Sequence, residues 1–250
     1  MSLTQTSVLS VAKTQLRYKT KANAGVFISL IAAQFLAALF TYSSGVASSG
    51  GGSETVTYSV KYISGDIIIA FTLIWALVIG FSLATNGFKM DFSFVSNRLS
   101  SNLSSAGFLV TIAVLGGVTA TLCGMMLRVI LYYTQSSVVT DAGFWIAPSV
   151  LAGGIFASVL YALLLSSIGY FTGMLVLRNR AFIVLLPGLF FGALYVEATS
   201  YGHVQPILVA IEFFTGESSL ALLAVKAIAV SAILIACAAL YSDRMEVRKQ

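Results

Sequence analysis

The chain has 250 residues, of which 58% are hydrophobic and 9% charged, and its mean hydropathy is +0.94. A soluble domain usually carries about 25% charged residues, so this composition excludes a sizeable soluble domain. It predicts an all-α integral membrane protein with a single membrane domain over residues 1–250. The net charge of +5 does not indicate a nucleic-acid partner, because the basic residues lie at the borders of apolar runs.

The first 21 residues combine positive charge with a short apolar stripe. The basic residues are Lys13, Arg17, Lys19 and Lys21. The stripe consists of Val8, Ala12 and Leu16, which recur every four residues and share one face of a helix. This pattern predicts an amphipathic elbow helix that lies on the lipid bilayer and leads into the first span. The alternative is a disordered basic tail.

Six apolar runs follow, each predicted to be a membrane-spanning helix. They cover residues 22–42, 67–84, 107–133, 148–177, 181–196 and 220–240. The fifth run has only about 16 residues and would extend about 24 Å, which is short for a bilayer core of about 30 Å. Between the first two runs, residues 43–62 are rich in glycine and serine, and we expect a flexible loop there.

A polar interruption separates the second and third runs at residues 86–105. Its apolar residues are Phe88, Phe92, Val95, Leu99 and Leu103, at spacings of four, three, four and four. On a helix these positions share a face. Such a helix would lie on the membrane surface or dock into the groove of a partner. Alternate residues are also apolar in the first half of the segment, which leaves a strand or a loop in the headgroups open.

Residues 197–219 separate the fifth and sixth runs. Their apolar middle, residues 206–214, is too short to cross a bilayer, and acidic residues lie on both sides of it. We therefore expect a short re-entrant or interfacial helix. Such a helix is tolerated only where protein or water satisfies its backbone.

Basic residues are distributed very unevenly between the two sides that six spans define. Eleven of the fourteen Lys and Arg residues fall on the side that holds both termini and residues 86–105, whereas the loops of the other side contain only Lys61. The positive-inside rule therefore predicts a multi-pass protein of the plasma membrane with cytoplasmic N- and C-termini.

Four ionisable residues within or beside the apolar runs are candidates for a functional role. Arg128 and Lys226 have apolar neighbours, and Glu197 and Glu212 are possible partners for them. The structural alternative is that both cations lie near the outer interface and extend their ends to water.

Two segments, residues 169–173 and residues 188–192, begin and end with glycine and match the small-xxx-small pattern. This pattern allows close helix contact, either within the subunit, which we favour, or between subunits. Catalysis is not indicated, because neither a nucleophile–base pair nor a metal-ligand pattern is found. Cys123 and Cys237 have no ligand spacing, and His203 is the only histidine. The serines and threonines of the spans are expected to bond their own helix backbone.

This layout resembles the membrane subunit of type-2 ABC exporters. That family has an elbow helix, six spans with cytoplasmic termini, a coupling helix between spans two and three, and a re-entrant outer segment between spans five and six. The matching parts here are residues 8–21, 88–103 and 201–214. The run Val95-Ser96-Asn97-Arg98-Leu99 is similar to the basic Ser-Arg-like element of the family.

The resemblance implies a non-catalytic permease subunit of a bacterial exporter of peptides, or of a system for self-protection against antimicrobial peptides. Two such subunits, identical or paralogous, would form the pathway, and a separate cytosolic ATPase dimer would bind ATP, so the chain itself would need no cofactor. In that assembly Phe88, Phe92, Val95 and Leu99 would form the packing face, near Ser96 and Asn97, and Arg98 would be the polar contact. The alternatives are an ion-coupled carrier that acts alone and a non-transporting sensor or immunity subunit.

Overall fold

The computed structural model describes nine segments of the chain: residues 8–44, 47–53, 56–63, 66–91, 98–134, 138–140, 147–199, 206–217 and 219–243. Within these segments lie eight helices and three short strands. They are α1 (Val8–Ala22), α2 (Gly25–Ser44), β1 (Ala47–Ser53), β2 (Val56–Ile63), α3 (Asp66–Asp91), α4 (Arg98–Thr134), β3 (Val138–Thr140), α5 (Pro148–Arg178), α6 (Phe182–Thr199), α7 (Pro206–Thr215) and α8 (Leu220–Asp243).

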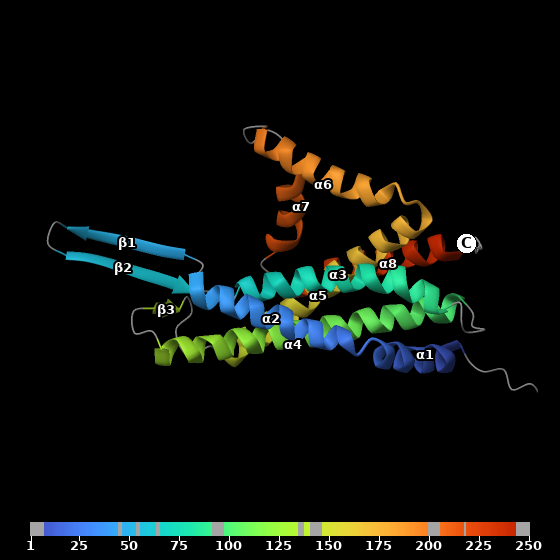
Figure 1. Ribbon diagram of the computed structural model, residues 1–250, viewed down its shortest axis with the longest axis horizontal. Coiled ribbons are helices and arrows are strands. Elements are labelled where there is room, and N and C mark those ends of the chain that lie inside the picture. Colours follow the sequence, from blue (N-terminus) through green and yellow to red (C-terminus); the bar gives the residue numbers. More distant parts are fainter. Residues whose placement is uncertain are drawn as a thin grey trace, which may run out of the picture.

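Six of the described helices are long and apolar enough to cross a membrane: α2, α3, α4, α5, α6 and α8 (Figure 1). Each coincides with one of the predicted runs, so the prediction of a helical protein with six candidate spans is confirmed. The largest difference is at the start of α4, which begins about nine residues before the predicted run. The serines there are accommodated in the helix by bonding their own backbone, since the hydroxyls of Ser104 and Ser105 both donate to the carbonyl of Ser101.

The segment predicted to be a flexible loop, residues 43–62, contains two strands instead. Strands β1 and β2 pair antiparallel from Ala47 opposite Tyr62 to Ser53 opposite Val56, and β3 joins β2 in parallel. The prediction was wrong because it was based on the glycines and serines of β1 and did not consider the composition of β2. The sequence of β2, VTYSVKYI, is rich in the β-branched and aromatic residues that favour strands.

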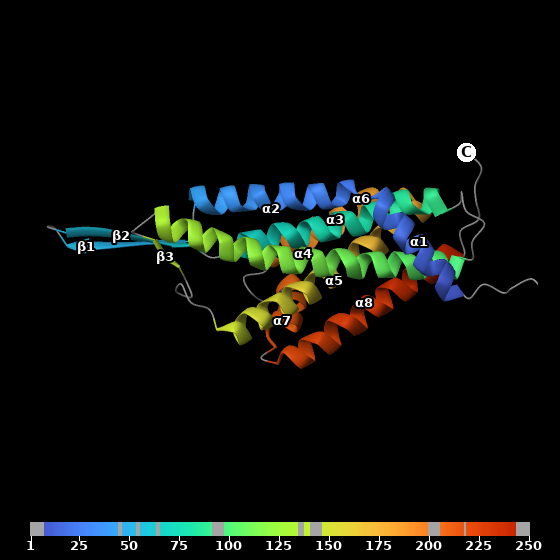
Figure 2. The same cartoon turned by 90° about the horizontal axis from the view of Figure 1, so that it is seen from below.

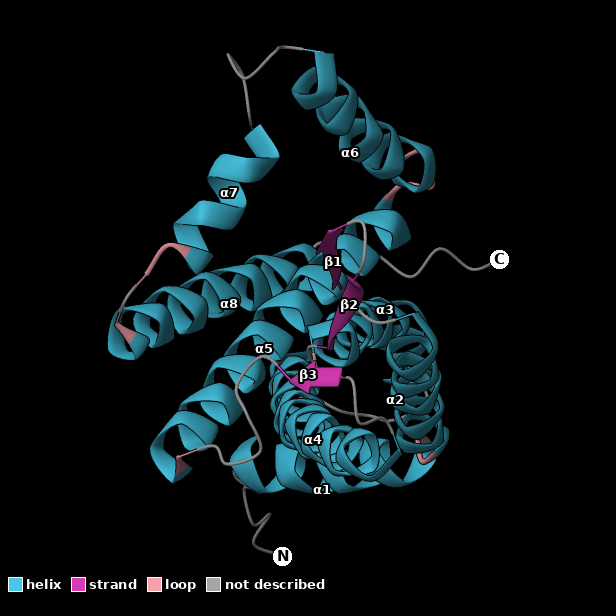
Figure 3. Ribbon diagram, turned by 90° about the vertical axis from the view of Figure 1, so that its left-hand side faces the viewer, coloured by secondary structure: helices cyan, strands magenta, loops and turns pink. Residues whose placement is uncertain are grey.

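Helix α5 is the centre of the bundle and contacts α3, α4 and α8 (Figure 3). Its closest approach is to α3, where glycines replace side chains. A Cβ atom on Gly173 would lie 2.7 Å from the Cβ of Ala84 and 2.8 Å from the carbonyl oxygen of Phe81, and one on Gly169 would overlap the carbonyl of Leu77. The small-xxx-small pattern of residues 169–173 therefore packs helices within the subunit, as predicted.

The second glycine pair has no such contact among the residues that the structure describes. A Cβ atom on Gly188 or Gly192 would meet nothing within 4 Å, and no residue of α6 is buried. Packing of this pair within the subunit therefore stays a prediction. Helices α6 and α7 lie outside the bundle of the other long helices (Figures 1 and 3).

The two ends of the bundle differ in what they carry. The described ends of α3 and α8, the start of α4 and the whole of α1 gather at one end, which we call the α1 end (Figure 1). The strands lie at the opposite end, which we call the sheet end. At the α1 end the guanidinium of Arg178, the last residue of α5, lies 5.1 Å from the ring centre of Tyr241 of α8.

Candidate functional site

The ammonium group of Lys19 fixes helix α1 to the start of α4, although the sequence pattern predicted this residue to be exposed. Lys19 is 6% exposed, and its Nζ donates to the Oγ of Ser105 at 2.8 Å and to the carbonyl of Ser101 at 3.3 Å. Ala12 is buried, and Leu16 would lie 3.2 Å from a Cβ on Gly107. One face of α1 therefore packs against α4 instead of resting on lipid alone.

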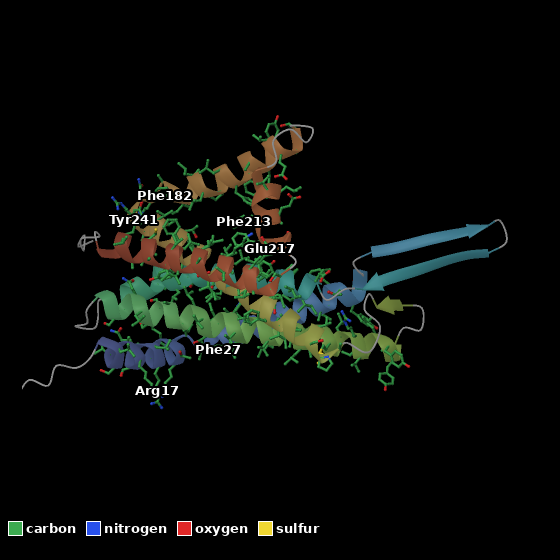
Figure 4. The ribbon with its side chains drawn as sticks, turned by 180° about the vertical axis from the view of Figure 1, so that it is seen from behind. Arg17, Phe27, Phe182, Phe213, Glu217 and Tyr241 are labelled. Carbon is green, nitrogen blue, oxygen red and sulfur yellow. The ribbon has the colours of Figure 1, made fainter. Side chains whose placement is uncertain are left out.

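The surface of α1 that α4 does not cover remains basic and open. Lys13, Arg17 and Lys21 are exposed, and no acidic residue occurs in the helix. Figure 4 shows Arg17 directed away from the other helices. The predicted stripe is thus correct for Ala12 and Leu16, and only Lys19 departs from the expected division between apolar and charged faces.

The predicted coupling helix is divided between two elements. Phe88 belongs to α3, which ends at Asp91, whereas Arg98 and Leu99 belong to α4. Phe92, Val95, Ser96 and Asn97 lie outside the described residues, so their predicted roles are not addressed. The described residues place the beginning of the predicted helix in α3 and its end in α4, and the coupling helix between them stays a prediction.

The start of α4 is also fixed to α5. The hydroxyl of Tyr170, a buried residue of α5, donates to the Oδ1 of Asn102 at 3.4 Å. Together with the bonds of Lys19, this contact joins α1, α4 and α5 at the start of α4.

A second set of contacts anchors the end of α7. The last carbonyls of a helix have no hydrogen-bond partner within that helix. Here side chains from other helices donate to two of them. The hydroxyl of Tyr161 on α5 donates to the carbonyl of Phe214 at 3.0 Å, and the Nζ of Lys226 on α8 donates to the carbonyl of Phe213 at 3.1 Å. The ammonium also pairs with Glu217 and lies 4.1 Å from the ring centre of Phe213 (Figure 4).

We call Tyr161, Lys226 and Glu217 the α7 anchor, and its contacts give Lys226 a structural role. The ammonium group of Lys226 lies near the C-terminal end of α7, where it complements the negative end of the helix dipole. Sequence reasoning named Glu197 and Glu212 as possible partners of Lys226. The partner that the structure shows is Glu217, which lies beyond the end of α7, nine residues before Lys226 along the chain.

The remaining charge candidates are not brought together. Arg128 is half-buried on α4, and its Nη1 has no hydrogen-bond partner; the same holds for the Oε2 of Glu197 on α6. Glu212 is exposed on α7. Among the residues that the structure describes, neither carboxylate forms an ion pair with Arg128, and no group of three His, Cys, Asp or Glu side chains could hold a metal.

One buried polar side chain was missed by the sequence reasoning. Gln34 of α2 is 6% exposed, and its Nε2 donates to the Oγ1 of Thr119 at 2.9 Å and of Thr72 at 3.3 Å. Both threonine hydroxyls donate to carbonyls of their own helices, so each is free to accept from Gln34. An amide within the first apolar run was the feature of the sequence that could have revealed this link between α2, α3 and α4.

Three other hydroxyls of the spans behave as expected. Thr121, Ser166 and Ser167 all donate to a carbonyl three or four residues earlier in their own helix. The Oγ of Thr121 also lies 3.3 Å from the Oγ of Ser158 on α5. These groups satisfy local backbone and hold neighbouring helices, and they form no nucleophile–base pair.

Comparisons of the chain with protein-family models, with curated proteins and with solved structures found no match. The assignment of a function therefore depends on the geometry of the α1 end and of the α7 anchor.

Proposed function

We propose that the chain is the permease subunit of an ATP-driven transporter of the ABC type, working as a dimer with separate cytosolic ATPase subunits. The observation that carries the proposal is the construction of the α1 end. A basic amphipathic helix is fixed by Lys19 across the start of α4, directly beside the connection between α3 and α4. In a transporter of this class, that is where an ATPase would push.

Two further features support the proposal. Helix α7 has ten residues, too few to cross a bilayer, and it lies across the direction of the long helices between the end of α6 and the start of α8 (Figure 1). The basic residues of α1 would face the cytoplasm, in agreement with the positive-inside rule. Both features match the layout of type-2 exporters that the sequence resembles.

The packing of α3, α4 and α5 supports a path by which the motion would spread. Helices α3, α4 and α5 are joined by backbone-to-backbone contact at Gly169 and Gly117, so they would move as one body. ATP-driven closure of the ATPases would displace the α3–α4 connection and tilt this body. Helix α6, which has no buried residue, would follow through its links to α5 and α7. Since the sequence contains no phosphate-binding Gly-Lys-Ser/Thr loop, ATP would bind to the partner.

The proposal is tested by co-purifying the full chain with its ATPase from native membranes and measuring ATP turnover. Leu99→Asp should weaken the association at least about a hundredfold, because an unpaired charge in an apolar contact costs several kcal/mol. Arg98→Ala should cost about 1–3 kcal/mol if the guanidinium is paired in the interface.

Tyr133→Asp provides the matched control. It introduces the same charge at the sheet end of the same helix, where the tyrosine is 79% exposed, and should leave association unchanged. Unchanged association and turnover in the inserted, well-expressed Leu99→Asp variant would remove the residue-level support for the proposal.

An ion-coupled carrier is the second candidate, and the buried amide of Gln34 is the observation that favours it. Carriers place polar groups at membrane depth. However, the hydrogen-bond partners shown for Gln34 are hydroxyls and a carbonyl of α3 and α4, with no acidic side chain among them. Transport into vesicles under an ion gradient without ATP would favour the carrier over the ABC subunit.

A further inference from the structure

An open apolar groove runs between α1, α4 and α8. Its volume is about 530 Å³, and its walls include Leu16 of α1, Val110 of α4, and Ile228 and Ile235 of α8. Figure 2 shows these three helices at the α1 end and along the middle of the bundle. A volume of this size is within the range that binds drug-sized molecules, and apolar walls suit a hydrocarbon chain.

The rim of this groove carries positive charge. Lys13 belongs to the apolar lining of the groove, yet the residue as a whole is exposed, an arrangement in which the stem contacts apolar surface while the ammonium stays accessible. Arg17, four residues later, lies on the same side of α1 and is exposed as well. Since Lys19 is engaged with Ser105 and α1 contains no acidic residue, the open charge on this helix is entirely basic.

The lining of the groove is apolar along its length. Ser231 of α8 belongs to this lining, but it is 2% exposed and its Oγ is covered by protein although the groove is open, so it offers no polar contact to a bound molecule. An apolar lining beside an exposed basic residue suits a lipid with a hydrocarbon chain and an anionic headgroup.

A second apolar groove on the same bundle differs from the first because it has no basic residue in its lining. It lies between α2 and α4, has a volume of about 410 Å³, and is lined by residues such as Ile31, Phe35 and Met126. No Lys or Arg lines it. A third groove, between α2 and α3, is lined by Phe40, Phe71 and Ile74 among others and also has no Lys or Arg in its lining. Of these three grooves on the described surface, the one at α1 combines an apolar lining with a basic residue.

We propose that the groove between α1, α4 and α8 is a binding site for an anionic phospholipid. One acyl chain lies along Val110 and Ile228, and the phosphate is held at Lys13. The bound lipid completes the packing of α1 on the bundle. This site is independent of the proposed transport function, since it depends only on the geometry of these three helices.

The test uses the full chain purified in detergent, with native mass spectrometry to count bound phosphatidylglycerol and phosphatidylcholine. Phosphatidylglycerol should bind more tightly, and Lys13→Gln should weaken it about fivefold, the effect of one basic residue near an anionic headgroup. Lys21→Gln removes the same charge from the same helix outside the groove, and should change binding less than twofold.

A second pair of variants tests the apolar part. Ala232 is exposed and lines the groove, so Ala232→Phe should fill it and reduce the binding of both lipids. Ala229→Phe places the same ring on α8 outside the groove and should not. Equal binding of the two lipids, equal effects of the two lysine variants, retention of a free fatty acid in place of the phospholipid, or unchanged binding in Ala232→Phe would each overturn the site.

Discussion

The close contact between α3 and α5 can be tested by substituting the glycines that form it. A glycine elsewhere on α5, away from the contact, provides the comparison. In Gly173→Ala the new methyl group would lie 2.7 Å from the Cβ of Ala84, and ordinary contact begins at 3.4 Å. The helices would have to separate by about 0.7 Å. Overpacking of this kind costs about 1–3 kcal/mol.

Gly154→Ala is the control, because Gly154 lies on the same helix with nothing within 4 Å of the new methyl group. Alanine raises helix propensity by about 1 kcal/mol at either position, so this term cancels when the two variants are compared. We expect Gly173→Ala to be about 2 kcal/mol less stable than Gly154→Ala, which is roughly a thirtyfold change in the folded-to-unfolded ratio.

Gly169→Ala should destabilise still more, since its methyl group would overlap the backbone carbonyl of Leu77, which cannot rotate away. The double variant of Gly169 and Gly173 should lose less than the sum of the two losses, because the first separation of α3 from α5 makes room for the second methyl group. The measurement is unfolding of the full chain in detergent, followed by circular dichroism. Equal stability of the variants at Gly154 and Gly173 would refute the close approach of the helices.

The remaining predictions concern orientation and the α7 anchor. A cysteine at Ser49, in β1, should react with an impermeant thiol reagent from outside the cell and one at Ser101, in α4, should not; the reverse result would invert the predicted topology. Tyr161→Phe removes the hydrogen bond to Phe214 and should speed amide exchange in the last turn of α7 about fivefold, the value of a bond worth about 1 kcal/mol. Tyr195→Phe, on an exposed tyrosine of α6, is the control and should leave this exchange unchanged, whereas equal rates in the two variants would show that the anchor does not hold α7.

The candidate spans were predictable from the sequence because a helix in a membrane satisfies its own backbone. Each run of apolar residues is therefore a local property, and the runs agree with α2–α6 and α8. The position of α1 against α4 was predictable only in part. Ala12 and Leu16 lie on the expected face, but the burial of Lys19 depends on Ser105, which is 86 positions away in the sequence.

The error at residues 43–62 has a local cause. The eight residues of β2 have a strand pattern that could have been recognised, whereas β1, with the sequence ASSGGGS, has little strand propensity and pairs because β2 provides a partner. At residues 88–103 the apolar spacing fits one helix, while the described ends of this range belong to α3 and α4. Spacing alone does not show where one helix ends and the next begins.

Helix α6 shows why hydropathy predicts spans but not their packing. All its large side chains, such as Val184 and Phe191, are at least partly exposed, and none is buried. In water, such a helix would be driven onto the bundle by the hydrophobic effect. In lipid that force is absent, so helices associate through close contact of small residues and through polar bonds. Helix α5 has both, in Gly169 and Ser158, and packs tightly, whereas α6 has Gly188 and Gly192 without an opposing helix among the described residues. The position of α6 is therefore set by its ends, which are the turn after Arg178 and the path through α7 to the anchor at Lys226, and a change at the α7 anchor should alter α6 more than any other span.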